Sequence, residues 1–162
     1  MIFDKSILQP GDALLYYDNR SLVDWIIGVK TSGRVGHIEI YTGQGMLVAS
    51  RNGIGVNRYA LRLDGLVVAR RPLVMLHPES AESWFIGHAR GQKYDFLGLL
   101  CFWLAVKRGS PDRMFCSEFA LRFYRRAFCQ PFNPDQDADR TSPFDFWKCG
   151  TFETVWQKDT KI

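Results

Sequence analysis

The chain has 162 residues, of which 46% are hydrophobic and 14% aromatic, so its composition excludes a disordered or low-complexity protein. This length suffices for one domain with a sizeable core that needs neither disulfides nor a metal ion. The formal net charge of +4 and the pI near 9.0 permit attraction to nucleic acid, anionic lipid or cell-wall polymer, but they select none of these partners. We therefore expect a single domain that spans residues 1–162.

The amino terminus differs from a signal peptide. It carries an acid at Asp4 and only a short apolar run before Pro10, instead of a basic region and a long apolar region. The most apolar stretch, residues 96–106, has about half of the roughly 20 residues that a membrane-spanning helix needs. We therefore expect no membrane span, and a cytoplasmic location for the chain as encoded.

The cysteines do not suggest a metal site. Cys101, Cys116, Cys129 and Cys149 are 15, 13 and 20 residues apart. No C-x-x-C or H-x-x-x-H pair provides the spacing of zinc ligands, so we expect no structural metal ion. Because the chain carries no secretory signal, free thiols are expected rather than disulfides.

The first half of the chain predicts short strands separated by turns. Turn residues at 9–12 precede an apolar strand over 13–17, and apolar residues at helical spacing over 21–29 predict a helix that ends near Gly33. Four further strands are expected at residues 35–41, 46–50, 54–59 and 66–71. Together the five strands predict one antiparallel sheet.

The second half predicts mainly helices. They are expected at residues 78–91, 96–106, 116–128 and, as a short turn, 142–147, and a last strand is expected at 152–156. Because most strands precede most helices, the fold class is expected to be α+β rather than alternating α/β.

Cys116 stands at the predicted start of the helix over 116–128. The positive end of the helix dipole and the unpaired backbone N–H groups there stabilise a thiolate and favour a reactive thiol. Cysteine is also among the most buried residue types, so a packing role is the alternative. For Cys101, which lies in the middle of an apolar run, the packing role is the better interpretation.

The predicted strand over 35–41 carries a candidate base. Alternation along the strand places His37, Glu39 and Tyr41 on one face and the two isoleucines on the opposite, core-facing side. The three polar side chains form either an ordinary solvated surface or a general base with an orienting acid. An imidazole within reach of Cys116 would complete a nucleophile–base pair.

Four short motifs occur in an order that resembles the permuted NlpC/P60 superfamily and, within it, the YiiX-like group of papain-like cysteine hydrolases. The motifs are PGD at 10–12, TSGRVGHIEIY at 31–41, KYDF at 93–96 and FCSE at 115–118. The resemblance extends from about Leu8 to Trp156. It implies a papain-like α+β fold in which an antiparallel sheet packs on helices and the histidine strand precedes the cysteine helix.

On this resemblance, Cys116 is the nucleophile and His37 the general base. The orienting residue of related proteins corresponds by counting to Ala49, which cannot orient an imidazole, and the neighbouring Ser50 faces the other way. We therefore assign this role to Glu39, whose Cα lies about 6–7 Å from that of His37 along the strand. The backbone N–H of Cys116 is the expected oxyanion donor, and no second donor is assigned.

Other polar residues have less specific roles. Asp12 and Tyr41 are candidate substrate-binding residues, although a turn-forming role explains Asp12 equally well. Glu118 is expected to be a structural acid in the first helical turn. The remaining charged feature is a basic stripe on the same helix, formed by Arg122, Arg125 and Arg126. Such a stripe is more often a solvated face than a binding site, so we expect no specific nucleic-acid partner.

The resemblance implies a cysteine hydrolase, of the thiol protease or amidase type, that needs no cofactor. It would cleave an amide bond in a peptide or a peptidoglycan stem peptide through a thioester acyl-enzyme. Two alternatives remain: a lipid-directed acyltransferase or thioesterase of the same fold, and a non-catalytic papain-like domain that holds a ligand in its cleft. The oligomeric state is unknown from sequence.

A cell-wall substrate would require another route for a cytoplasmic enzyme. Either a phage-derived protein is released on lysis, or the enzyme recycles cell-wall fragments inside the cell. The sequence does not choose between these routes.

Overall fold

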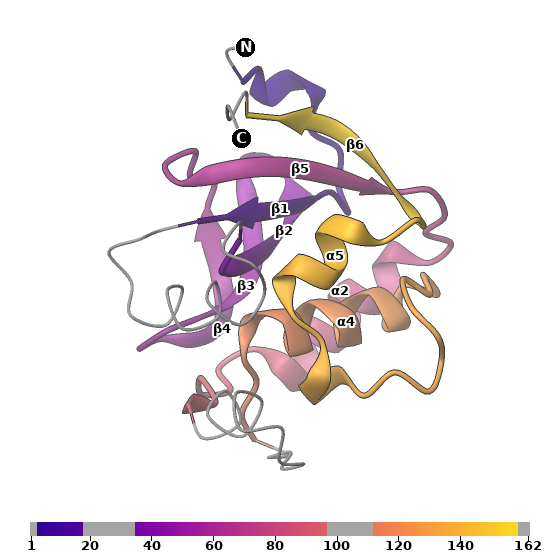
Figure 1. Cartoon of the computed structure of the whole chain (residues 1–162). Coiled ribbons are helices and arrows are strands. Elements are labelled where there is room, and N and C mark those ends of the chain that lie inside the picture. Colours follow the sequence, from indigo (N-terminus) through magenta and orange to yellow (C-terminus); the bar gives the residue numbers. More distant parts are fainter. Residues whose placement is uncertain (1–2, 18–34, 97–111, 159–162) are drawn as a thin grey trace.

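The computed structural model describes residues 3–17, 35–96 and 112–158, which form an α+β fold (Figure 1). The helix predicted over 21–29 and almost all of the one predicted over 96–106, including Cys101, lie outside these residues. In the described part, a sheet forms one layer and the longer helices gather on one of its sides.

The sheet has six strands, all paired antiparallel. They are β1 (Ala13–Tyr16), β2 (His37–Gly43), β3 (Met46–Arg51), β4 (Gly55–Ala60), β5 (Leu66–Pro72) and β6 (Phe152–Gln157), in the order β4-β3-β2-β1-β5-β6. The five strands predicted in the first half are confirmed. The late strand β6 joins the same sheet beside β5, which places the two ends of the described chain at one edge.

In the described ranges, three α-helices lie on one side of the sheet: α2 (Pro78–Trp84), α4 (Cys116–Arg126) and α5 (Pro143–Lys148). Shorter helical segments are η1 (Lys5–Ile7), η2 (Phe85–Ala89) and η3 (Ala138–Arg140). The helix expected over 78–91 is present, but its second half is the π-helical η2. The predicted turn at 142–147 is α5, where Ser142 and Asp145 form a capping box.

Helix α4 ends two residues earlier than predicted. Phe128 has a φ of 55°, in the left-handed region that breaks a helix, and the backbone N–H of Cys129 donates to the Tyr124 carbonyl at 2.9 Å. The preceding apolar pattern continues through this turn, which is why the sequence alone extends the helix.

The sheet separates two buried clusters. The larger lies between the sheet and the helices, and it includes Ile38, Ile40, Cys116 and Phe119. The smaller covers the opposite face and includes Leu14, Tyr16, Leu47 and Leu66. The predicted core-facing side of β2 is therefore confirmed. The opposite side of β2 is buried as well, so a solvated surface around His37 is the wrong interpretation.

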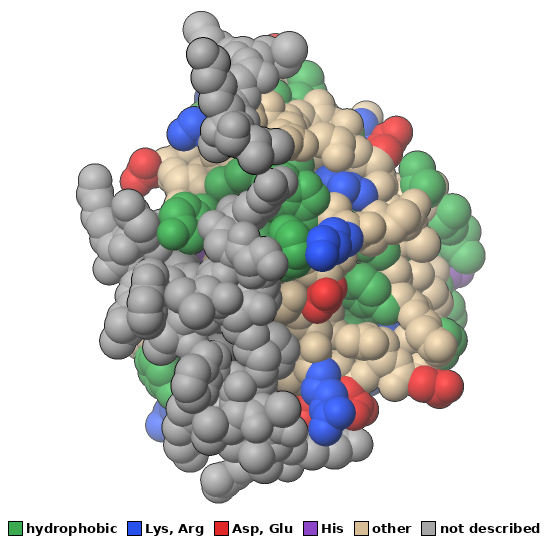
Figure 2. All heavy atoms as spheres, in the orientation of Figure 1, with side chains coloured by type: hydrophobic (Ala, Val, Ile, Leu, Met, Phe, Trp, Pro, Cys, Tyr) green, Lys and Arg blue, Asp and Glu red, His purple; other side chains and the backbone are tan. Residues whose placement is uncertain are grey.

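Charged side chains of both signs are interspersed over the described residues on the face shown in Figure 2. Two of the three arginines in the predicted basic stripe are occupied within the protein: Arg122 pairs with Glu118, and Arg125 donates to backbone carbonyls of residues 133, 134 and 136. Across the parts of the chain that the structure describes, no helix has the length and apolarity to cross a membrane.

Candidate active site

Cys116 is the first residue of α4, as predicted. The residue before it, Phe115, has extended backbone angles and makes no side-chain cap to the helix. The N–H groups of the first turn therefore lack a capping side chain, and they point toward the end of the helix where Cys116 lies. Cys116 itself is fully buried. The position combines a thiol with the backbone donors and dipole that favour negative charge.

Hydrogen bonds on both sides of Cys116 hold the helix start in place. The Ser50 hydroxyl donates to the Met114 carbonyl at 2.5 Å, and the Ser117 hydroxyl donates to the Thr141 carbonyl at 2.6 Å. All of these contacts are buried. As predicted, Ser50 faces away from the side of β3 that Ala49 occupies. Its hydrogen bond to Met114 supports the segment that carries Cys116. The position of Ser50 in the sequence does not indicate this role.

The first prediction concerns this support. Replacing Ser50 with alanine leaves the Met114 carbonyl buried without its donor, so we expect a loss of about 1–3 kcal/mol in the free energy of unfolding and slower alkylation of Cys116. Urea unfolding and alkylation kinetics measure the two effects. Ser83→Ala, at an exposed position of α2, is the matched control. Equal stability of the two variants would contradict the prediction.

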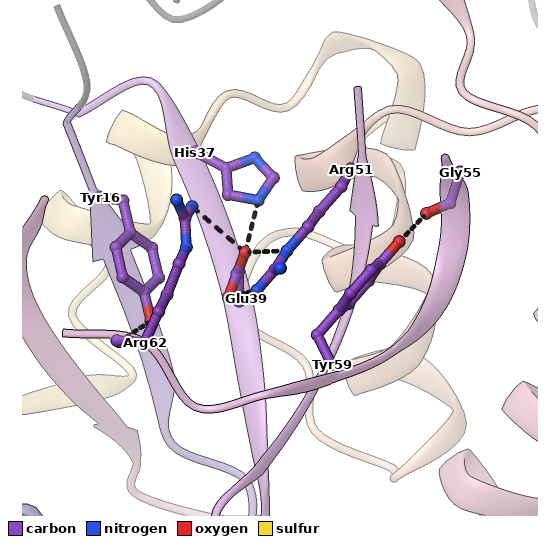
Figure 3. A network of polar contacts seen from close by, with 7 residues as sticks. All are labelled: Tyr16, His37, Glu39, Arg51, Gly55, Tyr59 and Arg62. Atoms are coloured by element: carbon purple, nitrogen blue, oxygen red, sulfur yellow. Dashed lines mark hydrogen bonds and ion pairs between the residues drawn. The ribbon is translucent and has the colours of Figure 1, made fainter. Parts of the chain in front are cut away.

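His37 begins β2 and lies opposite Tyr16 of β1. Its Nε2 is 3.0 Å from the Glu39 Oε1, so the side chain of Glu39 reaches back along the strand to the imidazole (Figure 3). An ionised carboxylate only accepts hydrogen bonds, so Nε2 carries the proton and donates. The other ring nitrogen, Nδ1, is then the atom available to interact with Cys116, which helps to raise the pKa of His37.

The charges of these groups stabilise one another. Burial of His37 lowers its pKa, but the interactions with Cys116 and with the Glu39 carboxylate outweigh burial and raise the pKa to about 10. Burial of Glu39 raises its pKa, but the hydrogen bonds and positive charges of His37, Arg51 and Arg62 outweigh it and lower the pKa to about 2. The raised pKa of His37 and the lowered pKa of Glu39 favour an imidazolium beside an ionised carboxylate.

Two arginines that sequence reasoning missed complete the surroundings of Glu39. Arg51 donates through Nε and Nη2 to the two carboxylate oxygens at 2.8 and 3.0 Å, and Arg62 Nη2 lies 3.2 Å from Oε1. Arg51 is two residues after Ala49 on β3, so the period of the strand places both residues on one face. This pattern could have indicated Arg51 as a neighbour of the orienting position. Arg62 follows β4 and had no local signal.

The position expected for the orienting residue lies beside Glu39. Ile40 pairs with Val48 in the β2–β3 ladder, so continuing that register sets Ala49 opposite Glu39. Directly opposite residues of an antiparallel pair share one face of the sheet. The small alanine side chain therefore adjoins the Glu39 carboxylate instead of contributing a polar group.

The structure does not bring Asp12 and Tyr41 to the imidazole. Both Asp12 oxygens bind Arg71, at 2.8 and 2.9 Å, and one also accepts the Gln9 backbone N–H. The Tyr41 hydroxyl accepts the backbone N–H of Gly45 at the hairpin turn. Tyr41 is four residues from His37 along β2, or about 13 Å. The observed contacts give both side chains structural roles.

Glu118 is buried in the first turn of α4, where its Oε1 accepts a hydrogen bond from Arg122 at 2.7 Å. Burial raises the pKa of Glu118 to about 7, against the lowering effect of Arg122. The folded protein therefore holds this proton more tightly than the unfolded chain, and stability falls as the pH rises from about 4.5 to about 7.

The second prediction follows from this shift. Glu118→Gln removes the titration, so its stability relative to the unmodified protein should rise by about 3 kcal/mol between pH 4 and pH 8, from 1.36 kcal/mol per pKa unit. Urea unfolding of both proteins at the two pH values measures the difference. A stability difference that is the same at both pH values would contradict the shift.

The three described cysteines, Cys116, Cys129 and Cys149, are buried free thiols. Cys149 donates to the Pro131 carbonyl at 2.6 Å, and burial raises the pKa of Cys129 to about 11. Neither the hydrogen bond of Cys149 nor the burial of Cys129 involves an imidazole. In the described ranges, no group of three or more His, Cys, Asp or Glu side chains is arranged to hold a metal ion.

A comparison with known protein families finds no family model that matches this chain, and a comparison with curated proteins finds no significant match. The functional interpretation therefore depends on the ordered motifs of the sequence and on the geometry around Cys116.

Proposed function

We propose that the protein is a papain-like cysteine hydrolase of the permuted NlpC/P60 type that cleaves an amide bond in a peptide or a peptidoglycan stem peptide. The observation that carries the proposal is the position of His37, which bonds to Glu39 at 3.0 Å and lies close enough to Cys116 for that cysteine to raise the pKa of the imidazole. Cys116 lies at a helix start, where a thiolate is stabilised. The three groups match the roles of nucleophile, base and orienting acid.

In the first step, the Cys116 thiolate attacks the carbonyl carbon of the scissile amide. The carbonyl oxygen becomes an oxyanion, which the backbone N–H of Cys116 stabilises at the uncapped end of α4. As the C–N bond breaks, the His37 imidazolium gives its proton to the leaving nitrogen. The products of this step are a free amine and a thioester on Cys116, with His37 neutral.

In the second step, neutral His37 takes a proton from a water molecule that attacks the thioester carbonyl. The C–S bond breaks, the carboxylic acid product leaves, and the thiolate–imidazolium pair is restored. Glu39 stays ionised throughout, holds the Nε2–H of His37, and so keeps Nδ1 directed at the sulfur.

The third prediction tests the reactive thiol. Iodoacetamide at pH 6, well below the ordinary thiol pKa of about 8.5, should modify Cys116 before Cys129 and Cys149. All three are buried, so a difference in exposure does not explain such a preference. Peptide mass spectrometry after timed quenching gives the rate at each cysteine, Cys101 included. Equally slow modification of all four cysteines would count against a catalytic thiol.

The reaction class is tested with substrates. Incubation with peptidoglycan fragments should yield cleaved peptides and a transient acyl adduct on Cys116, detected by mass spectrometry of the intact protein. An adduct formed from phospholipids instead would favour the acyltransferase or thioesterase alternative. A reactive thiol is required by both enzymatic alternatives, and its absence would leave the ligand-binding domain.

A further inference from the structure

The single negative charge of Glu39 is paired with the positive charges of two arginines. Arg51 alone neutralises it through a two-point contact, and Arg62 adds a second permanent positive charge at 3.2 Å. Two guanidinium charges against one carboxylate leave one excess positive charge around Glu39, the residue that bonds to His37. The Nε of Arg62 is also buried without a hydrogen-bond partner among the described residues, so its donors are only partly used.

Both guanidinium groups lie over tyrosine rings (Figure 3). Arg51 lies 3.9 Å from the centre of the Tyr59 ring, and Arg62 lies 4.3 Å from the centre of the Tyr16 ring. The rings are themselves fixed. The Tyr59 hydroxyl donates to the Gly55 carbonyl at 2.7 Å, and that of Tyr16 donates to the Arg62 carbonyl at 3.1 Å. This stacking preorganises the arginines and reduces the entropy lost when they bind a ligand.

The two arginines extend from the buried carboxylate toward solvent. The Glu39 side chain is fully buried, whereas the side chains of Arg51 and Arg62 are 24% and 36% exposed. Each guanidinium has five N–H donors, and the contacts with Glu39 use two from Arg51 and one from Arg62. Apart from the buried Nε of Arg62, the unused donors and the excess charge therefore lie beside Glu39, the partner of His37, on side chains that are partly exposed to a substrate.

We propose that Arg51 and Arg62 form a subsite for a carboxylate of the substrate, close to the amide bond that Cys116 attacks. This inference rests on the proposed function and narrows its substrate class to peptides with a free carboxylate near the scissile bond. Guanidinium groups match the planar geometry of a carboxylate and form charge-assisted hydrogen bonds to it. A neutral peptide would leave the excess positive charge without a partner.

The test uses two alkylating agents of similar size and opposite character, the anion iodoacetate and the neutral iodoacetamide. The ratio of their rates at Cys116 is divided by the same ratio for N-acetylcysteine, which removes their intrinsic difference. We expect this normalised ratio to fall about fivefold in Arg62→Gln and to be largely retained in Arg62→Lys. Arg58→Gln, which removes an equally exposed arginine that pairs with Glu82, should leave the ratio unchanged.

A charge-balanced double variant separates direct binding from an indirect effect through Glu39. Glu39→Gln combined with Arg62→Gln removes one charge of each sign. If Arg62 binds the anion directly, the ratio stays low in this variant. A ratio restored to the original value, or an unchanged ratio in Arg62→Gln, would overturn the subsite.

The control reaction distinguishes failure of the subsite from failure of the proposed function. If iodoacetamide modifies Cys116 fast but the normalised ratio is unchanged in Arg62→Gln, the subsite alone is rejected. If iodoacetamide modifies Cys116 no faster than Cys129 and Cys149, the proposed hydrolase is rejected and the subsite with it.

Discussion

Replacing Cys116 with serine should abolish turnover, with a fall of about 10⁴-fold or more, because the proposed reaction passes through its sulfur. Serine is close to cysteine in size, so it should fit the buried site of Cys116. The fold should therefore persist. The measurement is product formation from the substrate identified by the fragment screen, together with the loss of the acyl adduct on the intact protein.

Cys129→Ser is the matched control for this variant. Cys129 is also a buried free thiol, and it lies three residues after the end of the cysteine helix. Among the described contacts of Cys129, none is with an imidazole. The Cys129→Ser variant should keep its turnover per folded molecule. Comparable activity in Cys116→Ser and the unmodified protein would reject Cys116 as the nucleophile.

Replacing Glu39 with glutamine is expected to have two large effects. The variant leaves Arg51 and Arg62 without their carboxylate, which should cost about 2 kcal/mol of unfolding free energy, less than for a fully buried pair because both arginines are partly exposed. It also removes the acceptor that orients His37, so turnover should fall about 100-fold. Urea unfolding and steady-state kinetics measure the two quantities.

A pH profile distinguishes positioning of His37 from a purely structural role of Glu39. The carboxylate helps to raise the pKa of His37 to about 10, so its removal should lower that pKa. The alkaline limb of the rate of Cys116 alkylation, which follows deprotonation of His37, should then move to lower pH. Stability alone would not shift this limb.

Asp12→Asn is the control for Glu39→Gln. It breaks another buried carboxylate–arginine pair, with Arg71, at the far end of β1. It should lower the stability by a similar amount but leave the pH profile of Cys116 alkylation in place. An identical shift in both variants, or no shift in Glu39→Gln, would contradict the orienting role.

The local sequence determined the secondary structure well where periodicity and end signals agree. Alternating residues predicted the strands and placed Ile38 and Ile40 on the core side of β2. The helical pattern over residues 116–128 predicted that Cys116 starts a helix. These features depend on contacts between residues that are near in the chain, so one sequence contains the information.

Only the tertiary structure decided what surrounds the candidate base. Arg51 and Arg62 meet Glu39 from different strands and loops, and Ser50 reaches Met114 across 64 residues of chain. From the sequence, the polar face of β2 could equally have been exposed to solvent. In the structure, a second layer of apolar side chains buries it. Alternation along a strand shows which residues share a face, but the cover on that face comes from distant segments, and so do the partners of a buried charge.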